Sequence, residues 1–194
     1  MKPPAEILGA RRQATELVSA DAVLKAIDQV AVRMTVVLAE QNPLLISVLE
    51  GGLPFAGLLL QRLDFPLQIA HVHVGRYGHE TRGSQLHWYS KPRVSLAGRH
   101  VVFVDDILDQ AITLAELRSW ALEQGAAAVD VCVLVDKQIA NAEQRPVQAD
   151  FTALSCPDRF LFGCGMDYQG YWRNLPGIYA MAEESNDNSA EGQR

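Results

Sequence analysis

Short apolar runs alternate with helical apolar patterns along most of this chain. The runs are rich in β-branched and aromatic residues and are bounded by turn residues, which is typical of buried strands. We predict strands at residues 45–49, 67–74, 101–105 and 129–135, and helices near residues 54–63 and 113–124. This alternation favours right-handed βαβ crossovers and therefore a parallel sheet.

A longer helix is predicted before the first of these strands. Ser19 is expected to cap its N-terminus, because a serine oxygen can accept a hydrogen bond from a free N–H group of the first turn. Apolar residues then recur at steps of three and four, at Val23, Ile27, Val30, Met34 and Val37. Pro43 marks the end of this helical region, since proline cannot continue a helix, and Gly125 closes the helix near residues 113–124.

Two segments lack such periodicity. Residues 75–99 contain glycine, serine, threonine, histidine and several charges, and they are too long for an ordinary connection, so we predict a mobile flap. Residues 183–194 are acidic and polar and are predicted to be a disordered tail. We expect residues 1–182 to form a single domain, because no linker or internal repeat interrupts them.

Composition and charge narrow the class of protein. With 194 residues, of which 48% are hydrophobic and 21% charged, the chain is typical of a soluble globular domain with a sizeable core. A net charge of −6 argues against a general nucleic-acid surface, which needs clustered lysine and arginine. Local basic groups could still bind one small anionic substrate.

The cysteines and the N-terminal sequence bear on the compartment. Cys132, Cys156 and Cys164 lie in apolar, strand-like segments without metal-ligand spacing, so we predict buried free thiols in a reducing compartment. The sequence shows neither the apolar region of a signal peptide nor a run long enough to cross a bilayer. We therefore expect a cytoplasmic protein without a membrane partner.

The most informative stretch is residues 101–117, VVFVDDILDQAITLAEL. Its buried strand is followed by Asp105 and Asp106, at the edge where open α/β sheets bind ligands. A short turn then leads to a helix near Thr113, so free N–H groups and a positive helix end face the turn. Two carboxylates beside such an anion cradle suit a sugar phosphate, whose hydroxyl groups or bound Mg²⁺ would meet the acids. On this segment alone, a flavodoxin-like or response-regulator-like strand ending in two acids is the alternative.

Several blocks of sequence resemble one enzyme family. Residues 101–117 resemble the signature of the type I phosphoribosyltransferases. Residues 134–138 (LVDKQ) and 157–181 (PDRFLFGCGMDYQGYWRNLPGIYAM) resemble the purine-binding half of the hypoxanthine-guanine phosphoribosyltransferases. Residues 48–60 resemble the pyrophosphate loop of that family, and residues 76–88 resemble its active-site flap. The resemblance implies an α/β fold, a Rossmann-like parallel-sheet core of the type I phosphoribosyltransferases with a small hood region and a mobile flap.

The ribose-phosphate half of the site is expected at the strand end and the turn. Asp105 and Asp106 are placed to accept bonds from the ribose 2′ and 3′ hydroxyls, directly or through Mg²⁺. Asp109 is by resemblance the acid/base group near the purine imidazole nitrogen, and a turn or N-cap aspartate is the alternative. The resemblance implies that the turn wraps the 5′-phosphate, with the Thr113 hydroxyl as a donor, through Asp109, Gln110, Ala111, Ile112 and Thr113.

This turn departs from the family at two positions. Related enzymes generally have glycine where Ala111 stands, and glycine permits a positive φ and a close approach of the backbone to phosphate. Gln110 replaces the more usual threonine. An alanine with a negative φ would keep the loop, so we expect phosphate binding to survive.

The purine and pyrophosphate groups follow from the same resemblance. Lys137 would bond the 6-oxo group of hypoxanthine or guanine, Phe160 would stack on the purine, and Leu161 would offer main-chain groups to the base edge. Adenine carries a donor at the 6-position and should be rejected. Asp167 would bind Mg²⁺ near the pyrophosphate and lend backbone to the purine 2-position, and Arg173 would hold pyrophosphate as a planar cationic fork. A surface lysine, a core phenylalanine and an arginine in a structural ion pair are the alternatives.

Two further segments are expected to contact the reaction centre. Glu50, Gly51 and Gly52 match a loop whose main chain binds pyrophosphate in the family. A lysine is common where Glu50 stands, and a carboxylate repels pyrophosphate unless Mg²⁺ or an arginine intervenes, so backbone N–H groups should bind. In the flap, Tyr77 with Arg76 would close over the centre and exclude water.

These residues together predict a cytoplasmic purine salvage enzyme. It would use Mg²⁺ and transfer the 5-phosphoribosyl group from phosphoribosyl pyrophosphate to a 6-oxopurine, hypoxanthine or guanine, giving IMP or GMP and pyrophosphate. The alternative is a regulatory or nucleotide-binding protein of the same fold with weak or no turnover, which Ala111 and Glu50 favour. A binder of sugar phosphate alone needs no purine or pyrophosphate groups, so the alternative is opposed by Asp109, Lys137, Asp167 and Arg173. The resemblance also implies a homo-oligomer, a dimer or tetramer.

Overall fold

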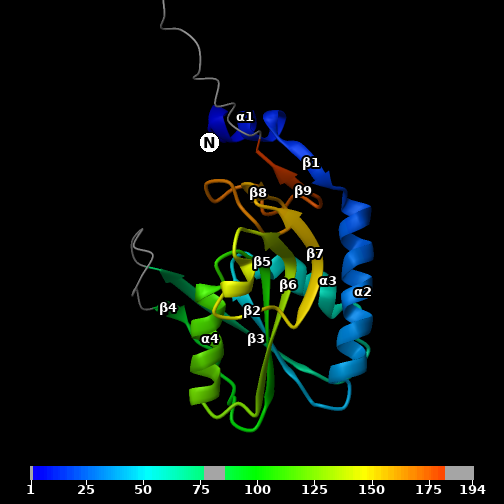
Figure 1. Cartoon of the computed structure of the whole chain (residues 1–194), viewed down its shortest axis with the longest axis vertical. Helices are drawn as coiled ribbons and strands as arrows, with labels where there is room; N and C mark the ends of the chain where they lie inside the picture. Colours follow the sequence, from blue (N-terminus) through cyan, green and yellow to red (C-terminus); the bar gives the residue numbers. More distant parts are fainter. Residues whose placement is uncertain (1, 77–85, 182–194) are drawn as a thin grey trace, which may run out of the picture.

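The computed structural model describes residues 2–76 and 86–181 (Figure 1). In chain order its elements are α1 (Ala5–Gln13), β1 (Thr15–Val18), α2 (Ala20–Leu38), β2 (Leu44–Leu49), α3 (Gly52–Leu60), β3 (Gln68–Arg76), β4 (Leu86–Ser90), β5 (His100–Leu108), α4 (Ile112–Glu123), β6 (Ala128–Gln138), the 3₁₀ turn η1 (Ala142–Gln144), β7 (Phe151–Pro157), β8 (Leu161–Phe162) and β9 (Ile178–Ala180). All the predicted strands and helices are present, with shifted ends. The α/β fold class is confirmed.

A six-stranded sheet in the order β4-β3-β2-β5-β6-β7 forms the centre of the molecule. Every neighbouring pair is parallel except β3 and β4, which are antiparallel. The carboxyl ends of β2, β5, β6 and β7 therefore meet at one edge of the sheet, the upper edge in Figure 1. This is the edge at which open α/β sheets bind ligands.

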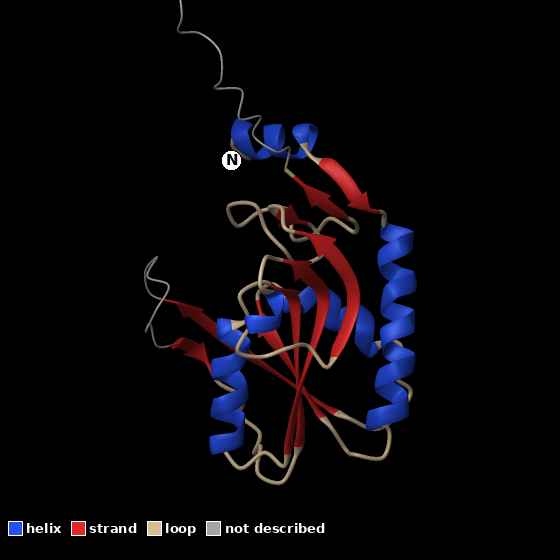
Figure 2. Ribbon diagram, viewed as in Figure 1, coloured by secondary structure: helices blue, strands red, loops and turns tan. Residues whose placement is uncertain are grey.

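Helices cover both faces of this sheet (Figure 2). On one face, α2 and α3 pack into a core that includes Ile27, Met34 and Phe55. On the other, α4 packs through Leu114 and Leu117. The side chains of β5 alternate between the two cores, so a continuous apolar run is required there. None of the described helices combines the length and apolarity needed to span a membrane.

The N-terminal half of α2 agrees with the prediction, and its last turn does not. The backbone N–H of Ala22 donates to Ser19 Oγ at 3.3 Å, which confirms the N-cap. The predicted apolar positions are buried up to Met34, but Val37 is 49% exposed and Leu38 takes the core position instead. The helix ends at Leu38, before Pro43. A step of four from Met34 to Leu38 keeps the stripe on the core side, because 3.6 residues make one turn.

Two strands run further than their apolar patterns indicate. Strand β5 continues to Leu108, so Asp105 and Asp106 lie within it and not after it. Strand β6 continues to Gln138 and includes Lys137. The ladder between β5 and β6 maintains both extensions, since Leu108 still pairs with Asp136. Polar residues can occupy a paired strand when its neighbour satisfies their backbone groups.

The predicted flap of residues 75–99 is wrong at residues 75–76, which end β3, and at residues 86–90. Residues from Leu86 to Ser90 form β4, which pairs with the end of β3. The Trp88 ring packs on Trp120 of α4 with centroids 4.7 Å apart, and this contact holds β4 against the helix. Residues 77–85 lie outside the described residues, and so does the predicted tail of residues 183–194.

A small antiparallel sheet, β1-β9-β8, lies beyond the carboxyl edge of the large sheet, with α1 above it (Figure 1). Segments from the two halves of the chain build it, because β1 pairs with β9 and β9 pairs with β8. This is the small hood region that the family resemblance implies. It forms a roof over the ends of the parallel strands.

Candidate active site

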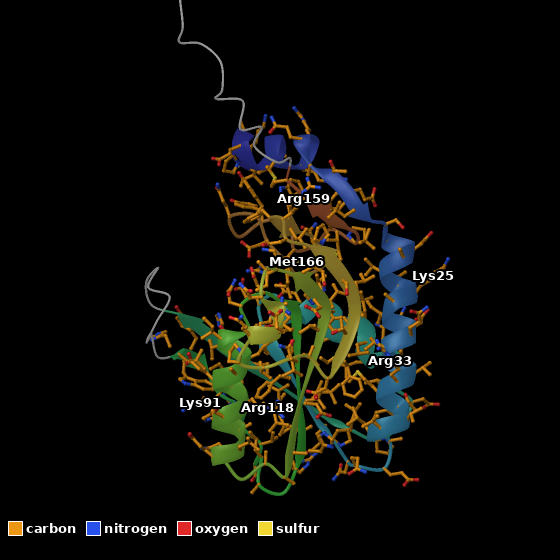
Figure 3. The ribbon with its side chains drawn as sticks, viewed as in Figure 1. Lys25, Arg33, Lys91, Arg118, Arg159 and Met166 are labelled. Atoms are coloured by element: carbon orange, nitrogen blue, oxygen red, sulfur yellow. The ribbon has the colours of Figure 1, made fainter. Side chains whose placement is uncertain are left out.

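A cavity of about 370 Å³ lies between the carboxyl ends of the strands and the small sheet. It brings together most of the predicted site residues: Glu50, Gly51, Asp105, Asp106, Asp109, Lys137, Phe160, Leu161, Asp167 and Arg173. Arg159 and Met166 also line it, and Figure 3 labels Arg159 at the small sheet and Met166 at the upper end of the large one. The structure thus gathers segments that are more than a hundred residues apart in the chain.

A second cavity, of about 280 Å³, adjoins the first through the strand end of β5. Asp105, Asp106 and Asp109 line both cavities. The predicted phosphate turn also lines it, with Gln110, Ala111, Ile112 and Thr113. The N-terminus of α4 faces this space, so an anion there would meet free N–H groups and a positive helix end.

The two adjacent carboxylates of β5 lie in a poorly solvated environment. Burial raises the pKa of Asp105 well above its usual range, and the neighbouring charge of Asp106 raises it further. Burial also raises the pKa of Asp106, while a hydrogen bond from Asp105 and the charge of Arg173 act in the opposite direction. A cation or several hydroxyl donors would stabilise the ionised pair, because each supplies the interactions that water no longer gives.

Two glycines allow the chain to pass close to Asp106. A Cβ atom on Gly51 would lie 2.1 Å from Asp106 Oδ2, which no real contact permits. A Cβ atom on Gly165, whose φ is +110°, would lie 2.2 Å from the Gly51 carbonyl oxygen. The loop of residues 50–52 and the loop before Asp167 are therefore stacked directly on the buried carboxylate. The Leu49–Glu50 peptide bond in this loop is cis.

Arg173 faces three carboxylates at once. Its Nη2 lies 2.7 Å from Asp167 Oδ1, its Nη1 3.9 Å from Asp106 Oδ2, and its Nε 3.8 Å from Glu50 Oε2. Arg173 therefore lines the cavity, as predicted, and also takes part in the structural ion pairs of the alternative. The Glu50 carboxylate, which would repel a pyrophosphate, has a compensating cation beside it.

Lys137 lies between two carboxylates. Its Nζ is 3.2 Å from Asp109 Oδ2 and 2.9 Å from Asp158 Oδ1, and only 14% of its side chain is exposed. Burial lowers the pKa of Lys137, but the bonds to Asp158 and Asp109 outweigh it, so the pKa is raised. The surface-lysine alternative is wrong. The N-cap alternative for Asp109 is also wrong, since Ala111 is the N-cap of α4 and Asp109 bonds Lys137 instead.

Phe160 and Leu161 occupy the roof side of the cavity. The Phe160 side chain is 54% exposed and meets Tyr168 edge to face, with ring centroids 5.8 Å apart. The core-phenylalanine alternative is therefore wrong, and more than half of the Phe160 side chain is accessible to a ligand. Leu161 is buried at the start of β8 and lines the cavity.

Ala111 adopts the backbone conformation that its side chain disfavours. Its φ is 62° and its ψ is 10°, which is left-handed, so the condition of a negative φ, under which an alanine would keep the loop, is not met. An L-residue other than glycine pays about 1 to 2 kcal/mol for that region. The turn therefore places Ala111 in a conformation that glycine adopts without this penalty.

The residues present fit Mg²⁺ that is shared with a phosphate ligand. Asp105, Asp106 and Asp167 offer the hard oxygen atoms that Mg²⁺ prefers. In the part of the chain that the structure describes, no group of three or more His, Cys, Asp or Glu side chains is arranged around one point. Mg²⁺ commonly uses one or two carboxylates, waters and substrate phosphates, and such a site needs no closed protein cage.

The sequence did not indicate a role in the site for Asp158, Arg159 and Met166. Asp158 and Arg159 directly follow β7, at the same edge as the other site residues. Had residues 151–157 been recognised as a strand, their carboxyl end would have indicated both. Met166 lies in an irregular loop and carries no sequence signal. Of the flap residues, Tyr77 lies outside the described residues, and Arg76 is described only as the last residue of β3.

Comparisons with known proteins find similarity to phosphoribosyltransferases over most of the chain. The family model described as "Phosphoribosyl transferase domain" matches residues 13–169. The hypoxanthine-guanine phosphoribosyltransferase of Streptococcus pneumoniae is 33% identical over 173 residues, which cover 89% of this chain and 95% of that protein.

Solved structures of similar fold cover most of the chain. A hypoxanthine phosphoribosyltransferase from Staphylococcus aureus has a TM-score of 0.81 and covers 92% of this chain and 97% of that chain, at 22% identity. The hypoxanthine phosphoribosyl transferase of Trypanosoma cruzi has a TM-score of 0.78 and covers 87% of this chain and 91% of that chain, at 27% identity. The latter was described in a study of its C-terminal region, oligomeric state and enzymatic activity.

The buried carboxylates should make stability depend on pH. Because the pKa of Asp105 is raised on folding, the folded state binds more protons than the unfolded state between the usual aspartate value of about 3.9 and the raised one. Stability should therefore fall as pH rises through that window. Asp105→Asn removes the effect, so the variant should be more stable than the parent at about pH 7 and equal or less stable at about pH 4.

Urea unfolding across this pH range, with a chelator present, measures the difference between the two proteins. Asp64→Asn, at an exposed position, controls for the loss of one negative charge. A parent whose stability relative to Asp105→Asn does not decline with rising pH would show that the Asp105 carboxyl is not perturbed.

Proposed function

Because the chain belongs to the phosphoribosyltransferase family, and within it to the hypoxanthine-guanine phosphoribosyltransferases, we propose that it is a purine salvage enzyme. It transfers the 5-phosphoribosyl group of phosphoribosyl pyrophosphate to hypoxanthine or guanine, and IMP or GMP and pyrophosphate result. The observation that carries this proposal is one cavity lined by groups suited to ribose, purine and pyrophosphate.

The sugar phosphate fits the two adjoining cavities. The 5′-phosphate would lie in the smaller one, against Thr113 and the N-terminus of α4. Asp105 and Asp106 would then accept bonds from the ribose 2′ and 3′ hydroxyls. Since both carboxylates border the two cavities, a single ligand can reach the phosphate turn and the purine side together.

The purine fits between Phe160 and Lys137. The exposed face of Phe160 suits stacking on a planar base. An ammonium has three donors, and Asp109 and Asp158 account for two of them, so the third can bind a purine 6-oxo group. Leu161 would present main-chain groups to the base edge, and Asp167 would lend its backbone to the 2-position.

The pyrophosphate fits beside Arg173 and the loop of residues 50–52. The guanidinium offers a planar fork for phosphate oxygens, and the glycines let backbone N–H groups approach closely. Mg²⁺, when bound by Asp105, Asp106 or Asp167 together with the pyrophosphate, would neutralise part of the leaving-group charge. The Glu50 carboxylate lies 3.8 Å from the same guanidinium, which would offset part of its repulsion of the ligand.

Asp109 would act as the base that accepts the proton of the purine imidazole ring. The purine imidazole nitrogen forms a bond to ribose C1′ while the bond from C1′ to pyrophosphate breaks. The proton on the imidazole ring passes to the Asp109 carboxylate, which is side by side with Lys137 and therefore near the base. Positive charge that develops on the ribose is close to Asp105 and Asp106.

The alternative of a binding protein with little turnover has less support. It was favoured by Ala111 and Glu50, but the turn at Ala111 keeps the left-handed conformation and Glu50 has Arg173 beside it. Glu50 thus has a compensating cation, and Ala111 strains the turn but still lines the smaller cavity.

We also propose a cytoplasmic homo-oligomer, a dimer or tetramer, that uses Mg²⁺. Large apolar side chains are exposed at Leu53, Ile69 and Tyr89, at 59%, 62% and 63%, and such residues are common where subunits meet. The three cysteines are free and buried, as predicted, and such thiols are stable in a reducing compartment.

Base choice tests the function and the purine pocket together. The purified protein, with Mg²⁺ and labelled phosphoribosyl pyrophosphate, should form IMP from hypoxanthine or GMP from guanine. If Lys137 bonds the 6-oxo group, kcat/KM for adenine should be at least about 10³ lower than for hypoxanthine. No product from either 6-oxopurine would refute the function, and comparable rates with adenine would refute the pocket.

Asp109→Asn should lower kcat by about 10² or more and leave both KM values little changed, because Asn keeps an acceptor for Lys137 but cannot take the proton. Asp158→Asn is the matched control, since it removes the other carboxylate on the same ammonium. Steady-state kinetics compare the two variants. A loss of kcat in Asp158→Asn as large as that in Asp109→Asn would deny Asp109 its role as the base.

Ala111→Gly should relieve the left-handed alanine and remove a Cβ atom from the phosphate cavity. We expect the free energy of unfolding to rise by about 1 kcal/mol and binding of the activated sugar to tighten about tenfold, with hypoxanthine binding almost unchanged. Calorimetric titration with phosphoribosyl pyrophosphate and Mg²⁺, and urea unfolding, measure the two effects.

The control for this variant is Ala115→Gly, in the first turn of α4, which should be destabilised by about 0.5 to 1 kcal/mol. Unchanged or weaker sugar binding by Ala111→Gly would mean that the alanine does not strain the phosphate site. Absence of binding by both the parent and Ala111→Gly would overturn the assignment of the substrate.

A further inference from the structure

Arg145 is a buried arginine that lies behind the cavity and not in its wall. Only 1% of its side chain is exposed. Among the described residues, Arg145 and Asp106 are the buried charged ones, and Asp106 already has a role in the site. Arg145 follows the 3₁₀ turn η1, in the connection between β6 and β7. A buried cation is costly unless it is paired and hydrogen-bonded, so its contacts are informative.

The guanidinium of Arg145 joins the ends of two neighbouring strands. Its Nη1 lies 2.6 Å from Asp136 Oδ1, and its Nη2 donates to the Leu108 carbonyl at 3.1 Å. The same Nη2 donates to the Lys137 carbonyl. Leu108 and Asp136 pair across the parallel ladder between β5 and β6, so one side chain holds both strands at their last paired position.

These contacts involve the main chain of Lys137 and the residues directly before Asp109 and Lys137, the two residues proposed to meet the purine. The Leu108 carbonyl and the Asp109 N–H belong to one planar peptide unit, so a bond to that carbonyl sets the direction in which Asp109 leaves the strand. Asp136 directly precedes Lys137, and the Lys137 carbonyl is itself bonded. The separation of 3.2 Å between Lys137 Nζ and Asp109 Oδ2 therefore depends on a frame that Arg145 completes.

We propose that Arg145 is a positioning residue for the purine half of the reaction. It fixes Asp109 and Lys137 relative to each other, so that the carboxylate meets the imidazole nitrogen and the ammonium meets the 6-oxo group of the same base. The inference rests on the proposed function. Residues 110–113 of the phosphate turn and Arg173 receive no bond from Arg145 in the described part of the chain, so the sugar and pyrophosphate groups should be affected much less.

Two replacements of Arg145 separate positioning from packing. Arg145→Met keeps an apolar stem of similar length but loses every donor, and it leaves the Asp136 carboxylate without its cation. Arg145→Lys keeps the charge and can pair with Asp136, but a single ammonium cannot reproduce the fork that also reaches two carbonyl groups. Arg62→Met is the matched control, because Arg62 likewise bonds an aspartate, Asp28, and a carbonyl, that of Leu58 at 2.7 Å, between α2 and α3.

Steady-state kinetics at a temperature where circular dichroism shows each variant folded provide the test. For Arg145→Met we expect the KM for hypoxanthine to rise about tenfold and kcat to fall about tenfold, while the KM for phosphoribosyl pyrophosphate stays within about twofold. Arg145→Lys should be intermediate in both affected constants. Arg62→Met should have a lower Tm with parental kinetic constants.

A folded Arg145→Met variant with parental kcat and parental KM for hypoxanthine would overturn the proposal, and so would equal losses of affinity for both substrates. If Arg145→Met does not fold, Arg145→Lys decides: a selective rise in the KM for hypoxanthine supports positioning, and parental constants refute it. A parent enzyme with no turnover of any 6-oxopurine would refute the proposed function, a result that is distinct from failure of the role of Arg145.

Discussion

The buried carboxylate of Asp106 lies where three separate segments of the chain converge. It extends from β5 against Gly51 of the loop after β2, and Gly165 of the loop after β8 closes over both. Only glycine fits at these two contacts, because a Cβ atom at either would lie near 2 Å from a neighbouring oxygen, at 2.1 Å and 2.2 Å. Arg173 then approaches from the side of the small sheet and faces the same carboxylate. The loops that contain Gly51 and Gly165 are thus positioned by direct packing around the Asp106 carboxylate.

The parallel sheet supplies the rest of the arrangement. Strands β5, β6 and β7 end at the same edge, and each end contributes charged side chains to the site. These are the aspartates of β5, Lys137 of β6 and Asp158 after β7. The small sheet adds Phe160 and Leu161 as a roof. Polar groups from distant parts of the chain meet in this way without long loops. Rigid strands hold these groups at fixed relative positions. A site that binds a base and phosphate groups at the same time requires this.

Much of this could be predicted from the sequence, and the limits have physical causes. The buried strands and α2 were predicted because both faces of the large sheet are covered, which leaves apolar runs and a clear helical stripe. The strands of the small sheet, such as Leu161–Phe162, are too short to show a period. Asp158 was missed with β7. The left-handed φ of Ala111 could not be predicted from the sequence. Alanine favours a negative φ, and the surrounding turn overrides this preference.

A crystal structure of the protein with IMP tests the central claim most directly. The account expects the 5′-phosphate against Ala111, Ile112 and Thr113, the ribose hydroxyls on Asp105 and Asp106, and hypoxanthine on the open face of Phe160 with its 6-oxo group bonded to Lys137 Nζ. IMP bound elsewhere on the protein, or bound in this cavity with its base directed away from Lys137, would contradict it.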